Sequence, residues 1–319
     1  MNPPLTSRPA VRIALAALML GCAARLPAQQ IAPAANEEVA RVHAAVAAMG
    51  KNWNATVLSE TAKLYTPLQQ QRGMSGIRQL RDIRYGRHAK QKLDLFIPEQ
   101  AFSEPGPVFI FLHGGEATGG NKTLSRTGEQ SFGNVARMAA RVGGVGINAD
   151  YRPVRNNGNR AGSAPAGAED VRAVIEWTHQ HIAQHGGNPN EIILFALGDG
   201  AAHVAGYLFH QPSQLVDGPG IAGAVLVSGT FGSANAQPLN LIETYQGKAV
   251  PLMLWSADLD PVQSGIGEMK DLLCRKYDQC PMFAELAGHN HVSAVMSFDT
   301  ADTSTMGYIH QFYHSAVRK

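Results

Sequence analysis

Residues 192–205 read Ile-Ile-Leu-Phe-Ala-Leu-Gly-Asp-Gly-Ala-Ala-His-Val-Ala, and this stretch is the strongest indication of the fold. The apolar run 192–195 is typical of a strand that is buried on both faces of a sheet. Small residues follow it directly, and helix-forming residues come next. The pattern therefore predicts a strand, a tight turn and a helix in direct succession, the arrangement that presents a catalytic side chain above a sheet.

Similar apolar runs occur on both sides of this stretch. We expect strands at residues 83–85, 93–97, 108–112, 145–147, 192–195, 224–227, 252–255 and 282–286. Helical segments lie between them, and the strongest covers residues 167–184, with one apolar face and Gly186 and Gly187 at its end. This alternation predicts an α/β fold with a mostly parallel, doubly wound sheet flanked by helices, spanning residues 80–319.

The N-terminal region has a different character. In residues 1–28, Arg8 and Arg12 precede the apolar run 13–20 and small residues follow, which indicates a secretory signal peptide. The run is too short to span a hydrocarbon core of about 30 Å, so we expect no transmembrane anchor. The protein is then periplasmic or secreted, and the alternative is a lipoprotein modified at Cys22. Residues 29–79 are expected to form a helical cap, with helices over 36–49 and 57–68.

The composition and net charge of the chain bear on its core and on its possible partners. The chain has 319 residues, 45% of them hydrophobic and 16% charged, with a formal net charge of +2. It can bury a large core, and its charge gives no reason to expect a nucleic-acid partner. Once the signal is removed, Cys274 and Cys280 remain as a pair in a chain bound for an oxidising compartment, so we expect a local disulfide. The oligomeric state stays open.

Polar residues that could bind a ligand or take part in catalysis follow several predicted strands. In a doubly wound sheet, ligands bind beyond the carboxyl ends of the strands. The sequence His113-Gly114-Gly115 follows the run 108–112, and glycines let backbone N–H groups approach a ligand oxygen closely. Asp260 comes after one later strand, and the pair His289 and His291 after the next. If the turn after residues 192–195 carries the nucleophile, these residues follow it in the chain order nucleophile, acid and base.

From about Tyr85 to Tyr313 the chain resembles the bacterial α/β-hydrolase carboxylesterases, in the branch of the hormone-sensitive-lipase-like and feruloyl-esterase-like enzymes. The motifs that carry the resemblance are residues 113–115, 151–152, 165–170, 186–189, 201–205, 258–261 and 288–291. The resemblance implies the α/β-hydrolase fold and a cofactor-free serine esterase that acts on a small ester. It further implies oxyanion-hole donors at Gly114, Gly115 and Asp199, Asp260 as the acid, and His291 as the base, with His289 as the rival base.

The chain departs from the family at the nucleophile. The family's G-x-S-x-G motif falls on residues 196–200, so Gly198 stands where the catalytic serine is expected. The tight turn requires small residues two positions on either side of the nucleophile, and Ala196 and Gly200 meet that requirement. A register with Asp199 at the apex would place Leu197 in one of these crowded positions.

Three hypotheses for function follow from Gly198. The first is an ester hydrolase, either weakened or using Asp199 as its nucleophile; the competing interpretation of Asp199 is a solvated residue at the start of the helix. The second is a noncatalytic protein that binds a small ligand or partner at the retained site. The third is an active esterase whose serine has been exchanged deliberately. We expect no metal site, because no further ligands for His289 and His291 are evident in the sequence.

Overall fold

The computed structural model describes residues 33–100, 103–115, 122, 132–152, 163–231, 237–277 and 280–317. The predicted signal peptide, residues 1–28, and the alternative lipid-bearing Cys22 lie outside these residues. Among the described residues, no helix is both long enough and apolar enough to cross a membrane.

The core of the fold is an eight-stranded sheet with the order β1-β2-β4-β3-β5-β6-β7-β8. Its strands are β1 (Ile77–Arg84), β2 (Lys92–Pro98), β3 (Gly106–Leu112), β4 (Val145–Ala149), β5 (Gly187–Leu197), β6 (Gly223–Val227), β7 (Leu252–Ala257) and β8 (Met282–Leu286). The pairs β1–β2 and β2–β4 are antiparallel, and every other pair is parallel. Each predicted strand is present, and the mostly parallel sheet is confirmed.

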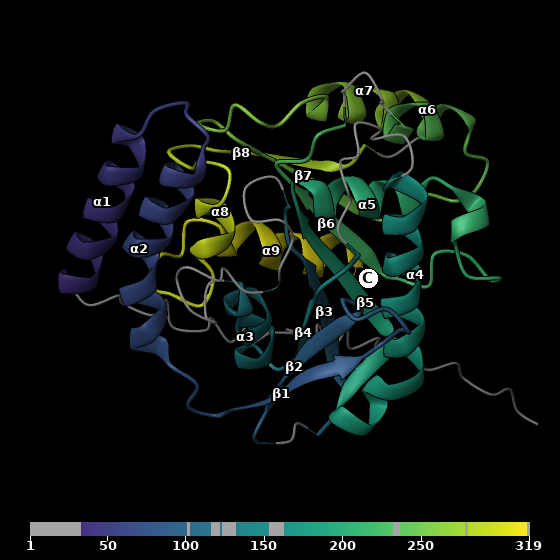
Figure 1. The fold of residues 1–319 in the computed structure, drawn as a ribbon, viewed down its shortest axis with the longest axis horizontal. Coiled ribbons are helices and arrows are strands. Elements are labelled where there is room, and N and C mark those ends of the chain that lie inside the picture. The colour runs from purple at the N-terminus through teal and green to yellow at the C-terminus, as the bar shows by residue number, and fades with distance from the viewer. Residues whose placement is uncertain are drawn as a thin grey trace, which may run out of the picture.

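Helices cover both faces of this sheet (Figure 1). One layer holds α4 (Ser163–His181), α5 (Asp199–Leu208), α6 (Gln237–Thr244) and α7 (Ile266–Lys276). The other holds α1 (Pro33–Ala48), α2 (Ala55–Arg72), α3 (Gly133–Arg141), α8 (Ser293–Met296) and α9 (Met306–Phe312). Each layer forms its own apolar core with one face of the sheet, which explains why the central strands are apolar throughout.

The strongest predicted helix corresponds to α4 and the short 3-10 turn that follows it, residues 182–185. Its predicted apolar face is buried as expected, including Val171, Val174 and Ile175. Gly186 ends the segment with a left-handed φ of 80°, a conformation that glycine adopts without steric cost.

The predicted N-terminal cap consists of the two helices α1 and α2. The side chain of Asn54 accepts hydrogen bonds from the backbone N–H groups of Thr56 and Val57, which fixes the start of α2. Strand β1 begins at Ile77, slightly before the predicted start of the sheet domain at residue 80. The cap packs beside α8 on the side of the sheet that carries α3 and α9 (Figure 1).

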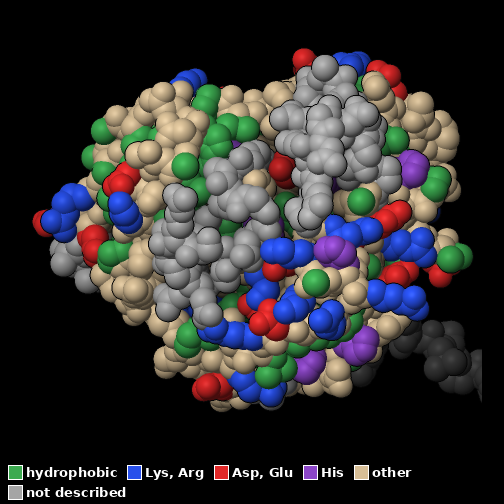
Figure 2. Space-filling model, in the orientation of Figure 1, with side chains coloured by type: hydrophobic (Ala, Val, Ile, Leu, Met, Phe, Trp, Pro, Cys, Tyr) green, Lys and Arg blue, Asp and Glu red, His purple; other side chains and the backbone are tan. Residues whose placement is uncertain are grey.

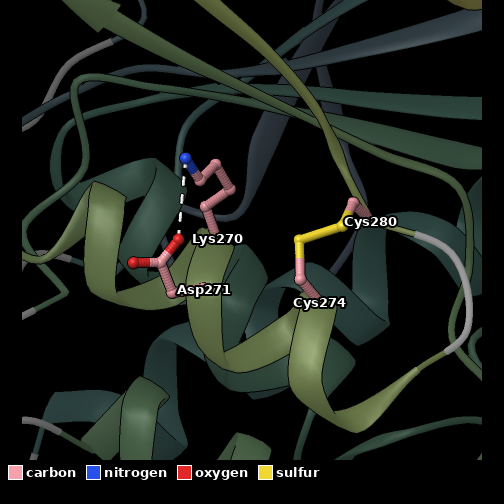
Figure 3. Close-up of a disulfide and its surroundings, with 4 residues drawn as sticks. All are labelled: Lys270, Asp271, Cys274 and Cys280. Atoms are coloured by element: carbon pink, nitrogen blue, oxygen red, sulfur yellow. Dashed lines mark ion pairs between the residues drawn. A yellow bond between two sulfur atoms is a disulfide. The ribbon is translucent and has the colours of Figure 1, made fainter.

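Cys274 and Cys280 form the predicted disulfide (Figure 3). It links the last turn of α7 to the segment just before β8.

On the face shown in Figure 2, positive and negative side chains are interspersed. This distribution agrees with the small net charge of +2.

Candidate active site

The turn between β5 and α5 has the geometry of a nucleophile elbow. Strand β5 ends at Leu197 and α5 begins at Asp199, so Gly198 alone joins them. Gly198 has a φ of 55° and a ψ of −119°, a combination that side-chain-bearing residues rarely adopt. Its N–H donates to the carbonyl of Val227, which ties the turn to the neighbouring strand β6.

Gly200 occupies a position where no side chain fits. A Cβ atom added there would lie 2.4 Å from the carbonyl oxygen of Leu112 and 2.6 Å from that of His113. Both contacts are with backbone atoms, so they cannot be relieved by turning a side chain. The first turn of α5 therefore presses against the end of β3, and the crowding expected from the sequence is present.

Replacing Gly200 by alanine is expected to destabilise the protein by roughly 1–3 kcal/mol or more, because the new methyl group overlaps two carbonyl oxygens. The matched control is Gly267→Ala in the exposed part of α7, where nothing lies within 4 Å of the new Cβ. That substitution should stabilise the helix by about 0.5–1 kcal/mol. Urea unfolding of both variants tests the pair, and equal effects would contradict the close approach of α5 to β3.

The glycine-rich loop after β3 is held by a buried polar network. His113 is fully buried, its Nδ1 lies 2.8 Å from the carbonyl oxygen of Gly114, and its Nε2 lies 3.3 Å from Asp150 Oδ1. The Tyr151 hydroxyl donates to the His113 carbonyl at 2.6 Å, and the two rings stack. These contacts fix the direction in which the backbone of Gly114 leaves the strand.

The carboxylate of Asp199 reaches this loop from the first turn of α5. Its Oδ2 lies 2.9 Å from the position that a Cβ atom on Gly115 would occupy. The side chain is partly exposed, and the N-terminal end of a helix favours a negative charge. The predicted oxyanion-hole residues Gly115 and Asp199 are thus neighbours, but the side chain of Asp199 places a carboxylate beside the glycine-rich loop.

Asp260 and His291 are joined at the same edge of the sheet. Asp260 follows β7 and His291 follows β8, and His291 Nδ1 lies 2.8 Å from Asp260 Oδ2. Both side chains are almost completely buried. The second carboxylate oxygen of Asp260 accepts the N–H of Val262, which orients the group. A carboxylate on Nδ1 places the ring proton there and makes Nε2 the basic nitrogen.

His289, the rival base, has different partners. Its Nδ1 lies 3.0 Å from Ser293 Oγ and its Nε2 lies 3.0 Å from Ser304 Oγ. Burial lowers the pKa of His289 to about 4, because the charged imidazolium loses its hydration. Asp260, the acid expected beside a catalytic histidine, contacts His291 and not His289. The geometry therefore favours His291 of the two.

The N-terminal cap contributes residues that the sequence did not point to. The ring of Trp53, in the loop between α1 and α2, lies 4.5 Å from the ring of His291, measured between centroids. The hydroxyl of Thr61 in α2 accepts a hydrogen bond from Asn290, the residue between the two histidines. No local pattern marks either residue, since only the packing of the cap against the histidine loop brings them there.

Comparisons with known proteins agree with this architecture. The model of the carboxylesterase family matches residues 92–251, half of the chain. Human neuroligin-2 is 29% identical over 147 residues, which are 44% of this chain and 17% of that protein. Esterase LipC of Mycobacterium tuberculosis is 26% identical over 141 residues, 44% of this chain and 32% of the relative. The chain thus matches only a third or less of the length of these relatives.

Solved structures show the same fold over most of the chain. A bacterial heroin esterase superposes with a TM-score of 0.58 at 15% identity, covering 88% of this chain and 98% of that one. A hyperthermophilic esterase from the archaeon Pyrobaculum calidifontis gives a TM-score of 0.57 at 13% identity, covering 87% and 97%. The predicted α/β-hydrolase fold is confirmed.

Proposed function

This chain belongs to the carboxylesterase family, and from that premise we propose that it binds a small ester-like molecule beside Gly198 without serine-nucleophile chemistry. The observation that carries the proposal is the elbow itself. Its apex has a φ of 55°, the sparsely allowed kind of conformation that is expected at a nucleophile elbow, yet the residue there is a glycine. Glycine relieves a strain of roughly 1–3 kcal/mol at such a position and supplies no attacking atom.

Asp199 supports the loss of ester chemistry. Acyl transfer passes through an oxyanion, which the enzyme stabilises with hydrogen-bond donors. The carboxylate of Asp199 lies against Gly115, on the loop expected to supply such donors. A negative charge at this place raises the energy of a developing oxyanion, whereas it opposes the binding of a neutral ester much less.

A second candidate function is slow ester hydrolysis by water, and the His291–Asp260 pair favours it. A histidine held by a carboxylate can act as a general base towards water as well as towards serine. In serine hydrolases, loss of the nucleophile typically leaves about 10³–10⁴-fold of rate enhancement over the uncatalysed reaction. Direct attack by Asp199 belongs to the same candidate, and the variant Asp199→Asn distinguishes it from water attack.

Export is part of the proposal. Residues 1–28 have the pattern of a secretory signal, and the Cys274–Cys280 disulfide suits an oxidising compartment. We propose a periplasmic or secreted protein, and the mass of the mature chain from its native host tests it. Cleavage among the residues before Gln30 without lipid supports this location. A diacylglyceryl group on Cys22 would favour the lipoprotein alternative, and an intact N-terminus would contradict export.

Binding and turnover can be measured on the same purified mature chain. Trp53 lies on His291, so saturable binding of a short-chain alkyl ester should change the tryptophan fluorescence. The control is Trp53→Phe, which leaves Trp177 and Trp255 in place and should remove most of the signal. With an aryl ester, turnover should fall at least about 10³-fold below the typical enzyme value of about 10 s⁻¹. Turnover near that typical value, or no saturable binding, would overturn the proposal.

A further inference from the structure

Three side chains from distant parts of the chain converge where the N-terminal cap meets the C-terminal part of the chain. They are His43 in α1, His289 after β8 and Asp302 in the segment before α9. Each offers one ligand atom, and these atoms lie within 4.8 Å of one another. His43 Nε2 is 2.7 Å from Asp302 Oδ2, and the two imidazole rings meet edge to face with centroids 5.3 Å apart.

Two imidazoles and one carboxylate form a donor set that zinc and related divalent transition metals prefer. In a tetrahedral site with bonds of about 2.0–2.2 Å, neighbouring ligand atoms lie roughly 3.3 Å apart, so small side-chain shifts would suffice here. His289 and Asp302 are buried, while the side chain of His43 is 31% exposed. A metal ion and a water ligand can therefore reach the cluster past His43.

The groups around the cluster resemble the outer layer of a metal site, in which hydrogen bonds orient the ligands. Ser293 Oγ contacts His289 Nδ1 and also accepts the N–H of Asn290, which leaves Nε2 as the ligand nitrogen. The Tyr65 hydroxyl donates to Asp302 Oδ2 at 2.8 Å, and the backbone N–H of Ser304 donates to Oδ1. Ser304 is exposed, so its hydroxyl, which contacts His289 Nε2, can move aside.

We propose that His43, His289 and Asp302 bind one divalent transition-metal ion, with zinc the best match to the ligands. The ion would join α1 to the loop that carries His291, because His289 lies two residues before it. It would also hold the cap in the position that places Trp53 on His291. The site serves to fix the cap, and its existence does not depend on whether the chain binds an ester.

A hydrogen-bond network alone is the competing explanation, since Asp302 already accepts from His43 and Tyr65. The test uses the full mature chain, freed of metal with a chelator that is then removed. Titration with Co²⁺ should give the intense visible absorption of a four-coordinate ion and saturate at about one ion per chain. Zn²⁺ should displace the Co²⁺ and raise the melting temperature by several degrees.

The key variant is His43→Gln, because a glutamine amide can still donate to Asp302 but is a poor zinc ligand. It should stay folded and lose at least about tenfold in Co²⁺ affinity. A loss of that size already follows when only a hydrogen-bond partner of a metal ligand is removed. The matched control is His314→Gln. His314 and His310 are exposed and their rings lie 4.4 Å apart, so this pair could bind metal adventitiously.

The proposal is upheld if His43→Gln weakens four-coordinate Co²⁺ binding by at least about tenfold and His314→Gln leaves the affinity unchanged. It is overturned if no saturable binding occurs, or if His314→Gln removes the binding and His43→Gln does not. Ester binding by the metal-free chain, followed through tryptophan fluorescence, is measured separately, so a failure of the metal site and a failure of the ester site are distinguishable.

Discussion

Replacing Gly198 by serine and Asp199 by alanine together should raise aryl-ester hydrolysis by roughly 10³-fold or more over the native chain. The serine supplies the attacking atom at a turn that already has the positive φ expected at a nucleophile elbow. The alanine removes the carboxylate that lies against Gly115. The His291–Asp260 pair, joined at 2.8 Å, is the group that we expect to accept the serine proton. Initial rates with a short-chain aryl ester, corrected for the rate in buffer, measure the gain.

The single variants separate the two contributions. Gly198→Ser alone should gain less, by about 10- to 100-fold, because the Asp199 charge still opposes the oxyanion. Asp199→Ala alone should gain nothing measurable, and Gly198→Ala controls for backbone strain at the same φ. Both substitutions of Gly198 should cost about 1–3 kcal/mol of stability. If the double variant is folded and no faster than Gly198→Ala, the remaining residues are not an esterase site.

The largest expected loss of stability comes from Asp299→Asn. Asp299 is buried between α3 and the loop after α8, where it accepts from Arg137 Nε at 2.8 Å and from Arg141 Nε at 2.5 Å. Removing its charge leaves the buried guanidinium of Arg137 without a counter-ion, which typically costs about 3–5 kcal/mol. Asparagine tolerates the positive φ of 55° at this position, so the loss reflects the charge and not the backbone.

A matched control lies on the surface of α7. Lys270 and Asp271 form an exposed ion pair at 3.6 Å, visible beside the disulfide in Figure 3. Asp271→Asn removes the same charge and should change the free energy of unfolding by less than about 1 kcal/mol. Urea denaturation of both variants gives the comparison. Similar losses for the two would mean that the Asp299 cluster stabilises the fold no more than a surface pair.

The sheet and the elbow could be predicted from the sequence because both depend on local patterns. Strands buried on both faces are apolar throughout, and each of these runs became a strand. The requirement for Gly200 follows from the same logic, since any strand that turns sharply into a helix crowds that position. Family resemblance then assigned roles to Asp260 and His291, which the fold brings together.

The distinction between His289 and His291 could not be predicted, because it depends on side-chain directions in one short loop. His291 turns towards Asp260, while His289 turns towards Ser293 and Ser304. The sequence also gave no sign that His43 and Trp53 approach this loop. They lie more than two hundred residues away along the chain, and only the packing of the cap against α8 places them there.

We propose that the protein keeps the scaffold of a carboxylesterase and lacks the serine nucleophile. Intact-mass spectrometry after exposure to an aryl fluorophosphonate tests it most directly, because the reagent labels activated serines. We predict no adduct on the native chain and a single adduct on Gly198→Ser, mapped to the introduced side chain. An adduct on the native chain, or no adduct on the folded variant, would show that this proposal is wrong.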